Sequence, residues 1–443
     1  MKKLKWSNYI VTFENDKKTL LFKSITGTLY SLPTEEYKII DSYIKDGLKT
    51  TDNATKRHIS ELYLDGMVVD RDVDEVETFK SSFKDKINSS KYGVIYFAPS
   101  LKCNLHCKYC IIGDSIENPC EDAVRDMTNK DTIQTAKWTY QMCNQHNIGE
   151  LKVILYGGEP TMMHKTHLLF LKTLNSLIEQ NENSIELNTM VITNGFKINK
   201  EKVKELVDIG VQTIQITLDG PPHIHDNRRY GVNKEKTFNQ ILENLIYTSE
   251  CFKNSVIRIN VDDENVNHIK ELIDILHSKK LERKCMLHFN LVDPSDFSEE
   301  SGYNEVTLNA FNVIYEYAFS KGFNVAPWRR YCSMPSKFYF AIDPDGNIYK
   351  CSNYLGTINK SIGNIYSGMP YDYKLGSIKE SCYACKFVGV CNGGCEVMRE
   401  TSKIGADYCF SKVNGDMLKA YYLALSNPAV IEKYHIKSLL RQK

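Results

Sequence analysis

Three cysteines lie close together in the stretch Cys103–Cys110, with the spacing C-x3-C-x2-C. A structural zinc site usually takes four ligands, whereas three thiolates can hold a cubane iron–sulfur cluster and leave one iron open to another ligand. The apolar, β-forming residues 93–99 predict a buried strand that ends just before these thiols. The spacing therefore predicts an iron–sulfur site at the C-terminal end of a strand. Three structural or zinc-binding cysteines are the alternative.

The composition is that of an ordinary globular protein, long enough for two or three domains. The chain has 443 residues, of which 42% are hydrophobic and 25% charged, and its formal net charge is +1. This charge gives no basic field for nucleic acid or a membrane surface, and no apolar run reaches the ~20 residues that a membrane helix needs. Residues 1–6 lack the apolar stretch of a signal peptide. We therefore expect a cytoplasmic protein with neither nucleic acid nor membrane as a partner.

Cysteine is frequent, with 14 in the chain, and its distribution is uneven. Seven cysteines lie between Cys332 and Cys409. A long chain without a signal peptide is not expected to hold so many as disulfides, so metal binding is the better interpretation. Four scattered cysteines are interpreted as small buried hydrophobic residues: Cys120, Cys143, Cys251 and Cys285.

Strand and helix patterns alternate from Gly93 to about Asp293, which predicts an α/β fold with a parallel sheet. The predicted strands are 93–99, 151–156, 187–193, 212–218, 256–261 and 286–292. The predicted helices are 130–145, 165–181, 199–209, 235–250 and 266–278. Six strands are too few for an eight-stranded barrel, and functional residues should gather at their C-terminal ends.

Polar and glycine-containing motifs follow three of these strands. They are Tyr156-Gly157-Gly158-Glu159-Pro160, Thr193-Asn194-Gly195 and Thr217-Leu218-Asp219-Gly220-Pro221, with His225-Asp226 and Arg228-Arg229 beyond. Together with the first cysteine set, these motifs resemble those of radical S-adenosylmethionine (SAM) enzymes. The resemblance implies a partial, TIM-like (β/α)6 barrel. It also implies a [4Fe–4S] cluster on Cys103, Cys107 and Cys110 that binds SAM.

The same resemblance implies which other residues contact SAM. Gly157, Gly158 and Glu159 would hold its amino group, because glycines let the backbone approach a ligand. Thr217 and Arg229 would bind its carboxylate, which a guanidinium fork suits, although Arg228 could replace Arg229. Asn194 would offer a polar side chain, and Tyr109 would pack on the adenine.

The second cysteine set has the spacing of the SPASM domain, which it resembles. This implies two auxiliary [4Fe–4S] clusters, an outer one on Cys382, Cys385, Cys391 and Cys409 and an inner one on Cys332, Cys351 and Cys395. Relatives with a fully enclosed inner cluster carry an eighth cysteine where this chain has Ala326, so the inner cluster has an open iron unless Cys285 or Tyr331 fills it. The Asp343–Asn347 turn predicts a β-hairpin between Phe338 and Tyr349. Two zinc sites are the alternative.

Residues 1–85 predict a separate small domain, with strands near 9–13, 19–23 and 29–32, helices at 34–44 and 54–64, and a closing strand at 66–70. This order resembles the winged-helix domains that recognise leader peptides; a structural extension is the alternative. The expected division is 1–85 for this domain, 86–92 linker, 93–300 barrel, 301–330 bridge, 331–415 SPASM domain and 416–443 tail.

These features predict a radical SAM/SPASM oxidoreductase that matures a ribosomally made peptide, bound through its leader. An electron donor such as flavodoxin or ferredoxin would reduce the first cluster. We expect a thioether crosslink from a cysteine sulfur to carbon, with a carbon–carbon or carbon–oxygen crosslink as the nearest alternative. The sulfatase-activating branch has an Asp after the second SPASM cysteine, where this chain has Ser352. An iron–sulfur electron-transfer protein is an alternative of another class, although it would not need the strand-end SAM contacts.

Overall fold

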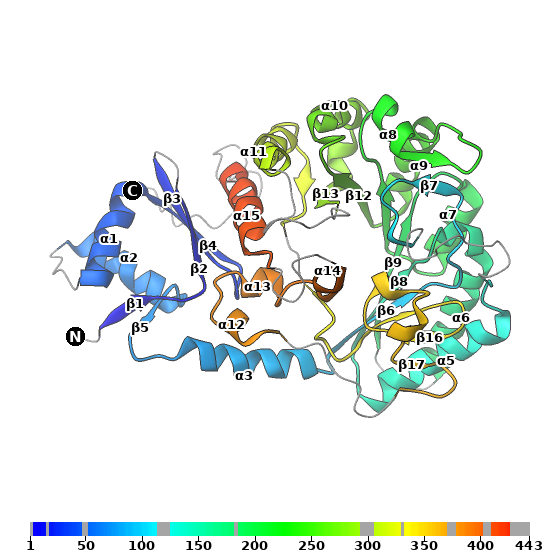
Figure 1. The fold of residues 1–443 in the computed structure, drawn as a ribbon, viewed down its shortest axis with the longest axis horizontal. Coiled ribbons are helices and arrows are strands. Elements are labelled where there is room, and N and C mark those ends of the chain that lie inside the picture. Colours follow the sequence, from blue (N-terminus) through cyan, green and yellow to red (C-terminus); the bar gives the residue numbers. More distant parts are fainter. Residues whose placement is uncertain are drawn as a thin grey trace.

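The largest element of the fold is a ten-stranded sheet with the order β14-β13-β12-β10-β9-β8-β6-β15-β16-β17 (Figure 1). The computed structural model describes residues 3–14, 17–46, 52–112, 125–180, 185–292, 305–328, 332–369, 378–401 and 409–425. The strands that the sequence predicts for the barrel are present and parallel. They are β6 (Tyr92–Phe97), β8 (Glu150–Leu155), β9 (Glu186–Thr193), β10 (Thr213–Thr217), β12 (Asn254–Val261) and β13 (Cys285–Leu291).

The predicted helices connect these strands and pack around the outside of the sheet (Figure 1). They are α5 (Asn129–Gln145), α6 (His164–Gln180), α7 (Lys200–Asp208), α9 (Phe238–Cys251) and α10 (Ile269–Ser278). Side chains of Thr128 and Asn199 cap α5 and α7 by accepting backbone N–H bonds. Short helical turns that the sequence did not predict are α8 (Pro222–Arg228), η1 (Pro160–Met163), η2 (Val266–His268) and η3 (Leu281–Arg283).

Further strands extend both edges of the barrel sheet. At one edge β14 (Asn324–Val325) runs parallel to β13. At the other, β15 (Tyr339–Ile342) runs parallel to β6 and forms the predicted hairpin with β16 (Asn347–Tyr349), which pairs with β17 (Gly363–Asn364). Buried Asp343 shapes the hairpin turn by accepting the N–H groups of Asp345 and Asn347, each at 2.9 Å. The cysteine-rich C-terminal segment is thus continuous with the barrel sheet.

The N-terminal residues form a small unit of their own (Figure 1). An antiparallel sheet contains β2 (Ile10–Glu14), β3 (Lys18–Lys23) and β4 (Thr28–Pro33), and the helices α1 (Thr34–Asp46) and α2 (Asn53–Leu64) follow it. The closing strand β5 (Val68–Asp70) pairs with β1 (Leu4–Trp6), which the sequence pattern did not predict. Asp52 caps α2 by accepting the N–H groups of Ala54 and Thr55.

Helices link the N-terminal unit to the rest of the molecule. Helix α15 (Ser411–Leu425) packs on α11 (Glu305–Ser320) and also reaches the small sheet (Figure 1). On α15, Tyr421 contacts Tyr315 of α11, with ring centroids 5.4 Å apart, and Tyr422 contacts Phe22 of β3 at 4.5 Å. The remaining helices are α3 (Glu75–Asn88), α12 (Glu380–Tyr383), α13 (Val388–Cys391), α14 (Glu396–Thr401), η4 (Ser352–Tyr354) and η5 (Ile358–Lys360).

None of the helices in the described ranges is long and apolar enough to cross a bilayer.

Candidate functional site

The first cysteine set lies where β6 leads into the barrel opening. Part of this stretch is a short strand, β7 (Leu105–Cys107), whose antiparallel partner β11 (Arg229–Gly231) places Cys107 opposite Arg229. Burial raises the pKa of the Cys103 thiol to about 12, and Glu159 and the other two thiols add to this rise. Burial also raises the pKa of Cys107, while the positive charge of Arg229 opposes that rise. The three thiols therefore act on one another in a buried site, and a bound metal would have to deprotonate them.

Gly157 and Gly158 hold the cysteine stretch against the end of β8. Gly158 N–H donates to the Ser100 carbonyl at 3.1 Å, and Glu159 N–H donates to the Lys102 carbonyl at 3.0 Å. A Cβ atom at Gly157 would lie 2.3 Å from the Ser100 carbonyl oxygen, and one at Gly158 would lie 2.2 Å from that of Lys102. Only glycine permits this approach of two backbones. The two glycines are therefore needed for backbone packing, in addition to the SAM contact that the sequence predicts.

Glu159 joins the ends of β8 and β9. Its carboxylate is 2% exposed and accepts hydrogen bonds from Thr161 N, Thr193 Oγ1 and Asn194 N, at 2.7–2.8 Å. The Asn194 side chain donates in turn to Asn104 Oδ1 at 2.8 Å and to Cys103 Sγ at 3.7 Å. The end of β9 is thus fixed to the first cysteine. The Glu159 carboxylate already has protein partners, so any amino group of SAM would share it with them.

Tyr109 is the centre of a buried polar network beside the thiols. Burial raises the pKa of its hydroxyl, which stays protonated and donates to Asp219. The same hydroxyl accepts from Arg229 Nη1 at 2.6 Å and from Asn260 Nδ2 at 3.0 Å. Asp219 is fully buried and accepts the Asn260 N–H at 2.8 Å. The sequence indicated Tyr109 and Arg229, but it gave no reason to include Asn260, which lies on β12.

The two neighbouring arginines have different surroundings. Arg228 binds Asp262 through two hydrogen bonds, at 2.7 and 2.8 Å, and Glu264 through a third at 3.0 Å. Arg229 instead bonds to Tyr109, and of the two guanidinium charges it has the larger effect on the pKa of Cys107. Of the two, Arg229 therefore faces the cysteine site. Thr217, the last residue of β10, is buried beside the turn that contains Asp219.

A group of tyrosines lines the barrel interior between the two cysteine sets. The rings of Tyr96 and Tyr156 meet edge to face with centroids 5.3 Å apart, and Tyr339 lies 5.5 Å from Tyr96. Burial raises the pKa of Tyr156, and both Cys110 and Cys351 add to the rise, so this phenol lies between the two sets. Sequence reasoning included Tyr156 only as part of the glycine-containing motif and gave no role to Tyr96 or Tyr339, because hydroxyl-bearing rings inside strands look like ordinary core residues.

A cationic side chain belongs to the same interior. Arg258 of β12 donates to Asn260 Oδ1 at 2.9 Å and acts electrostatically on Tyr96 and Tyr156. Burial and the charge of Arg258 lower the pKa of His288 to about 3, so this imidazole is neutral at physiological pH. The interior between the cysteine sets is therefore polar and carries a positive charge.

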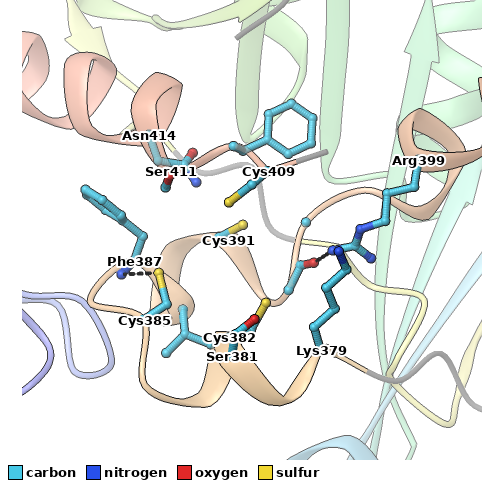
Figure 2. Close-up of a pocket in the computed structure, with 14 residues that line it drawn as sticks. Lys379, Ser381, Cys382, Cys385, Phe387, Cys391, Arg399, Cys409, Ser411 and Asn414 are labelled. Atoms are coloured by element: carbon cyan, nitrogen blue, oxygen red, sulfur yellow. Dashed lines mark hydrogen bonds between the residues drawn. The ribbon is translucent and has the colours of Figure 1, made fainter. Parts of the chain in front are cut away.

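The seven C-terminal cysteines fall into the two groups that the SPASM resemblance implies. Cys382, Cys385, Cys391 and Cys409 line one cavity of about 270 Å³ (Figure 2). Cys332, Cys351 and Cys395 form the other group: burial raises the pKa of Cys332 to about 11 and that of Cys351 to about 12, and the three thiols act on one another. Zn–S bonds of about 2.3 Å would draw four sulfurs around a single ion. Four thiols around one cavity are a ligand set for either a zinc ion or an iron–sulfur cluster, the two alternatives that the sequence leaves open.

Cys285 and Tyr331 were the two residues that the sequence offered as a fourth ligand of the inner cluster. Cys285 begins β13 and is buried in the main apolar core, as expected for a small hydrophobic residue. Burial raises the pKa of its thiol to about 12, with Lys284 as the opposing charge. Tyr331 lies outside the described residues, as does Cys120.

Known proteins resemble this chain in sequence and in fold. Residues 98–276 match the family model described as the Radical SAM superfamily. The radical SAM cyclopropyl synthase TigE of Paramaledivibacter caminithermalis is 24% identical to this chain. The alignment covers 88% of this chain and 89% of the relative.

Two solved structures resemble the fold, each with low sequence identity. The structure of native anSMEcpe with bound AdoMet and Cp18Cys peptide has a TM-score of 0.59 at 17% identity and covers 78% of this chain and 100% of that one. The structure of Streptococcus suis SuiB bound to precursor peptide SuiA has a TM-score of 0.50 at 15% identity and covers 90% and 97%. The fold prediction is confirmed.

Proposed function

We propose that this chain, a radical SAM enzyme whose residues 98–276 match the Radical SAM superfamily, matures a ribosomally made peptide by forming a cysteine thioether. The observation that carries the proposal is the inner cysteine group. In the described part of the chain it contains three thiols, Cys332, Cys351 and Cys395, and it lies across the tyrosine-lined interior from the SAM-binding set. Three thiolates would leave one iron of a [4Fe–4S] cluster for a sulfur of the substrate.

The residues of this chain would arrange the reaction between the two sets. When bound, the first cluster and SAM supply a 5′-deoxyadenosyl radical, which removes a hydrogen atom from a peptide carbon. Tyr96, Tyr156 and Tyr339 would exclude water from the interior, and Arg229 would orient SAM. Formation of the C–S bond releases the thiol proton and one electron, and Cys332, Cys351 and Cys395 would hold the group that supplies the place for this electron. Holding sulfur and carbon together makes this step effectively intramolecular.

Peptide substrates are supported by the relatives. SuiB and anSMEcpe were both solved with bound peptides, and SuiB resembles this chain over 90% of its length. The N-terminal sheet of this chain would bind the leader through one of its outer strands, where main-chain hydrogen bonds supply the affinity. Tyr422 of α15 already covers the face of the N-terminal sheet around Phe22. We therefore expect the peptide to pair with an outer strand of the sheet rather than to lie on this face.

A second candidate reaction is carbon–carbon bond formation. The similarity to cyclopropyl synthase TigE favours it, because the match covers 88% of this chain and 89% of the relative. That reaction would also oxidise the substrate radical but would need no thiol. The two candidates therefore differ in what happens to a cysteine of the peptide.

One experiment separates the two candidates. The precursor to test is a short cysteine-containing peptide encoded near this enzyme. It is incubated anaerobically with enzyme, SAM and dithionite and then treated with iodoacetamide. The thioether proposal expects a product two hydrogens lighter, with one cysteine no longer alkylated, and no such product from a Cys→Ser peptide. A modified Cys→Ser peptide, or a product in which every cysteine is alkylated, would favour carbon–carbon bond formation.

We expect the neighbouring arginines to respond differently to substitution. Arg229→Gln should weaken SAM binding by about 10- to 100-fold, because a charge-assisted hydrogen bond contributes about 1.5–3 kcal/mol. Arg228→Gln should instead lower thermal stability, since it leaves Asp262 without its partner at a buried guanidinium. Isothermal titration with SAM and a melting curve measure both effects. Equal loss of SAM affinity in the two variants would contradict the assignment of Arg229.

We also expect the leader to determine peptide affinity. A core peptide without its leader should bind at least about tenfold more weakly, because the leader tethers the core near the barrel. Deleting the N-terminal unit is a poor test, since it would expose Tyr422 of α15. Fluorescence anisotropy of labelled full-length and leaderless peptides measures the difference. Equal dissociation constants would refute leader recognition.

A further inference from the structure

The outer cysteine cavity is bordered by the start of α15. Cys409 lies two residues before Ser411, the first residue of this helix, and Asn414 in its first turn also lines the cavity (Figure 2). The unsatisfied N–H groups of a helix start carry partial positive charge. Two cationic side chains, Arg399 and Lys379, also line the cavity (Figure 2). An electron added to a group inside this cavity would therefore be stabilised.

The orientation of the Asn414 side chain is fixed by Trp328. Asn414 is fully buried, and its Oδ1 accepts a hydrogen bond from Trp328 Nε1 at 3.1 Å. An indole N–H can only donate, so the amide oxygen must face Trp328 and the amide nitrogen must face the other way. The assignment of oxygen and nitrogen thus follows from the partner.

The amide nitrogen of Asn414 is turned toward the thiols. Nδ2 is buried and has no hydrogen-bond partner among the described residues. Asn414 lines the same cavity as the four thiols, so its unpaired amide nitrogen lies at the wall of that cavity (Figure 2). A buried, unpaired N–H group costs about 1–3 kcal/mol. This cost would be removed if an acceptor sulfur occupied the cavity.

We propose that Asn414 donates a hydrogen bond to a sulfur of the outer cluster and thereby raises its reduction potential, with Trp328 as the residue that positions the amide. The proposal rests on the proposed three-cluster function. A cluster becomes more negative when it is reduced, so an N–H dipole aimed at its sulfur favours the reduced state. The outer site would then hold an electron more readily than without Asn414 and could accept the one released at the inner site.

The test is a redox titration of the anaerobically reconstituted full chain, followed by electron paramagnetic resonance. Asn414→Leu keeps a similar volume and removes the donor, so it should shift the potential of one auxiliary cluster to more negative values and leave the other clusters unchanged. Trp328→Phe frees the amide to rotate and should shift the same cluster in the same direction by a smaller amount. The matched control is Asn312→Leu on the exposed side of α11, which should shift none.

The outcomes distinguish this inference from the function on which it rests. Unchanged potentials in Asn414→Leu with iron content equal to that of the parent would overturn the role of Asn414. Should Asn414→Leu not fold, an unchanged potential in Trp328→Phe overturns it. If the parent protein itself binds zinc in the outer cavity, the cluster assignment fails instead.

Discussion

Replacing Cys103, Cys107 and Cys110 together by Ala is expected to reduce 5′-deoxyadenosine formation to the level seen without enzyme. The three cysteines are partly buried, with Cys107 close to Arg229 and its Tyr109 network, and a cluster without its thiolates cannot be held there. The C-terminal cysteines form separate groups, so the auxiliary clusters should remain bound. Chromatography of the nucleoside products and iron analysis of the same sample measure both results.

The control for this variant is Cys251→Ala, because Cys251 lies in α9 and packs against the main apolar core away from these groups. It should keep both SAM cleavage and iron content. Continued SAM cleavage by the triple variant would overturn the assignment of the first site. Loss of all iron from that variant would show that the sites do not load independently.

Gly158→Ala is expected to abolish SAM cleavage although it leaves all the cysteines in place. The added Cβ would lie 2.2 Å from the Lys102 carbonyl oxygen and 2.4 Å from that of Leu101. Both contacts are backbone atoms of the segment that leads into Cys103, so relief requires the cysteine stretch to move. Overpacking of this kind costs about 3 kcal/mol at the upper end of its usual range. The charge-transfer absorbance of the first cluster and product formation should fall together.

Gly149→Ala is the matched control for that variant. Gly149 is exposed, has no positive φ, and an added Cβ meets nothing within 4 Å. This variant should load iron and cleave SAM at the parental level. Full loading and parental activity in Gly158→Ala would show that the close approach of the two backbones is not required.

The barrel could be predicted from sequence because its strands and helices are long and follow regular patterns. What the pattern could not supply was pairing between distant segments. The hairpin β15–β16 was predicted from its turn, but its parallel pairing with β6 joins Tyr339 to Val94 across the chain. Likewise β1 and β7 are each three residues long, and each depends on a partner that is distant in sequence.

The site was predictable where a motif determined it. The resemblance to the SPASM domain implied two C-terminal cysteine groups, and the structure brings the same cysteines together. The sequence could not indicate Asn260 or Tyr339. Single polar residues inside strands acquire a role only when the sheet brings them close to the cysteines. The sequence also could not show which of Arg228 and Arg229 faces the first cysteine set, because Arg228 is held by Asp262, a residue 34 positions further along the chain.

The central claim is that SAM cleavage by this enzyme removes hydrogen from a peptide. The most direct measurement is the mass of 5′-deoxyadenosine formed with SAM, dithionite and a precursor peptide made from deuterated amino acids. Transfer of a deuterium atom from the peptide into 5′-deoxyadenosine is the predicted result. Unlabelled 5′-deoxyadenosine, formed at the same rate with and without the peptide, would contradict the claim.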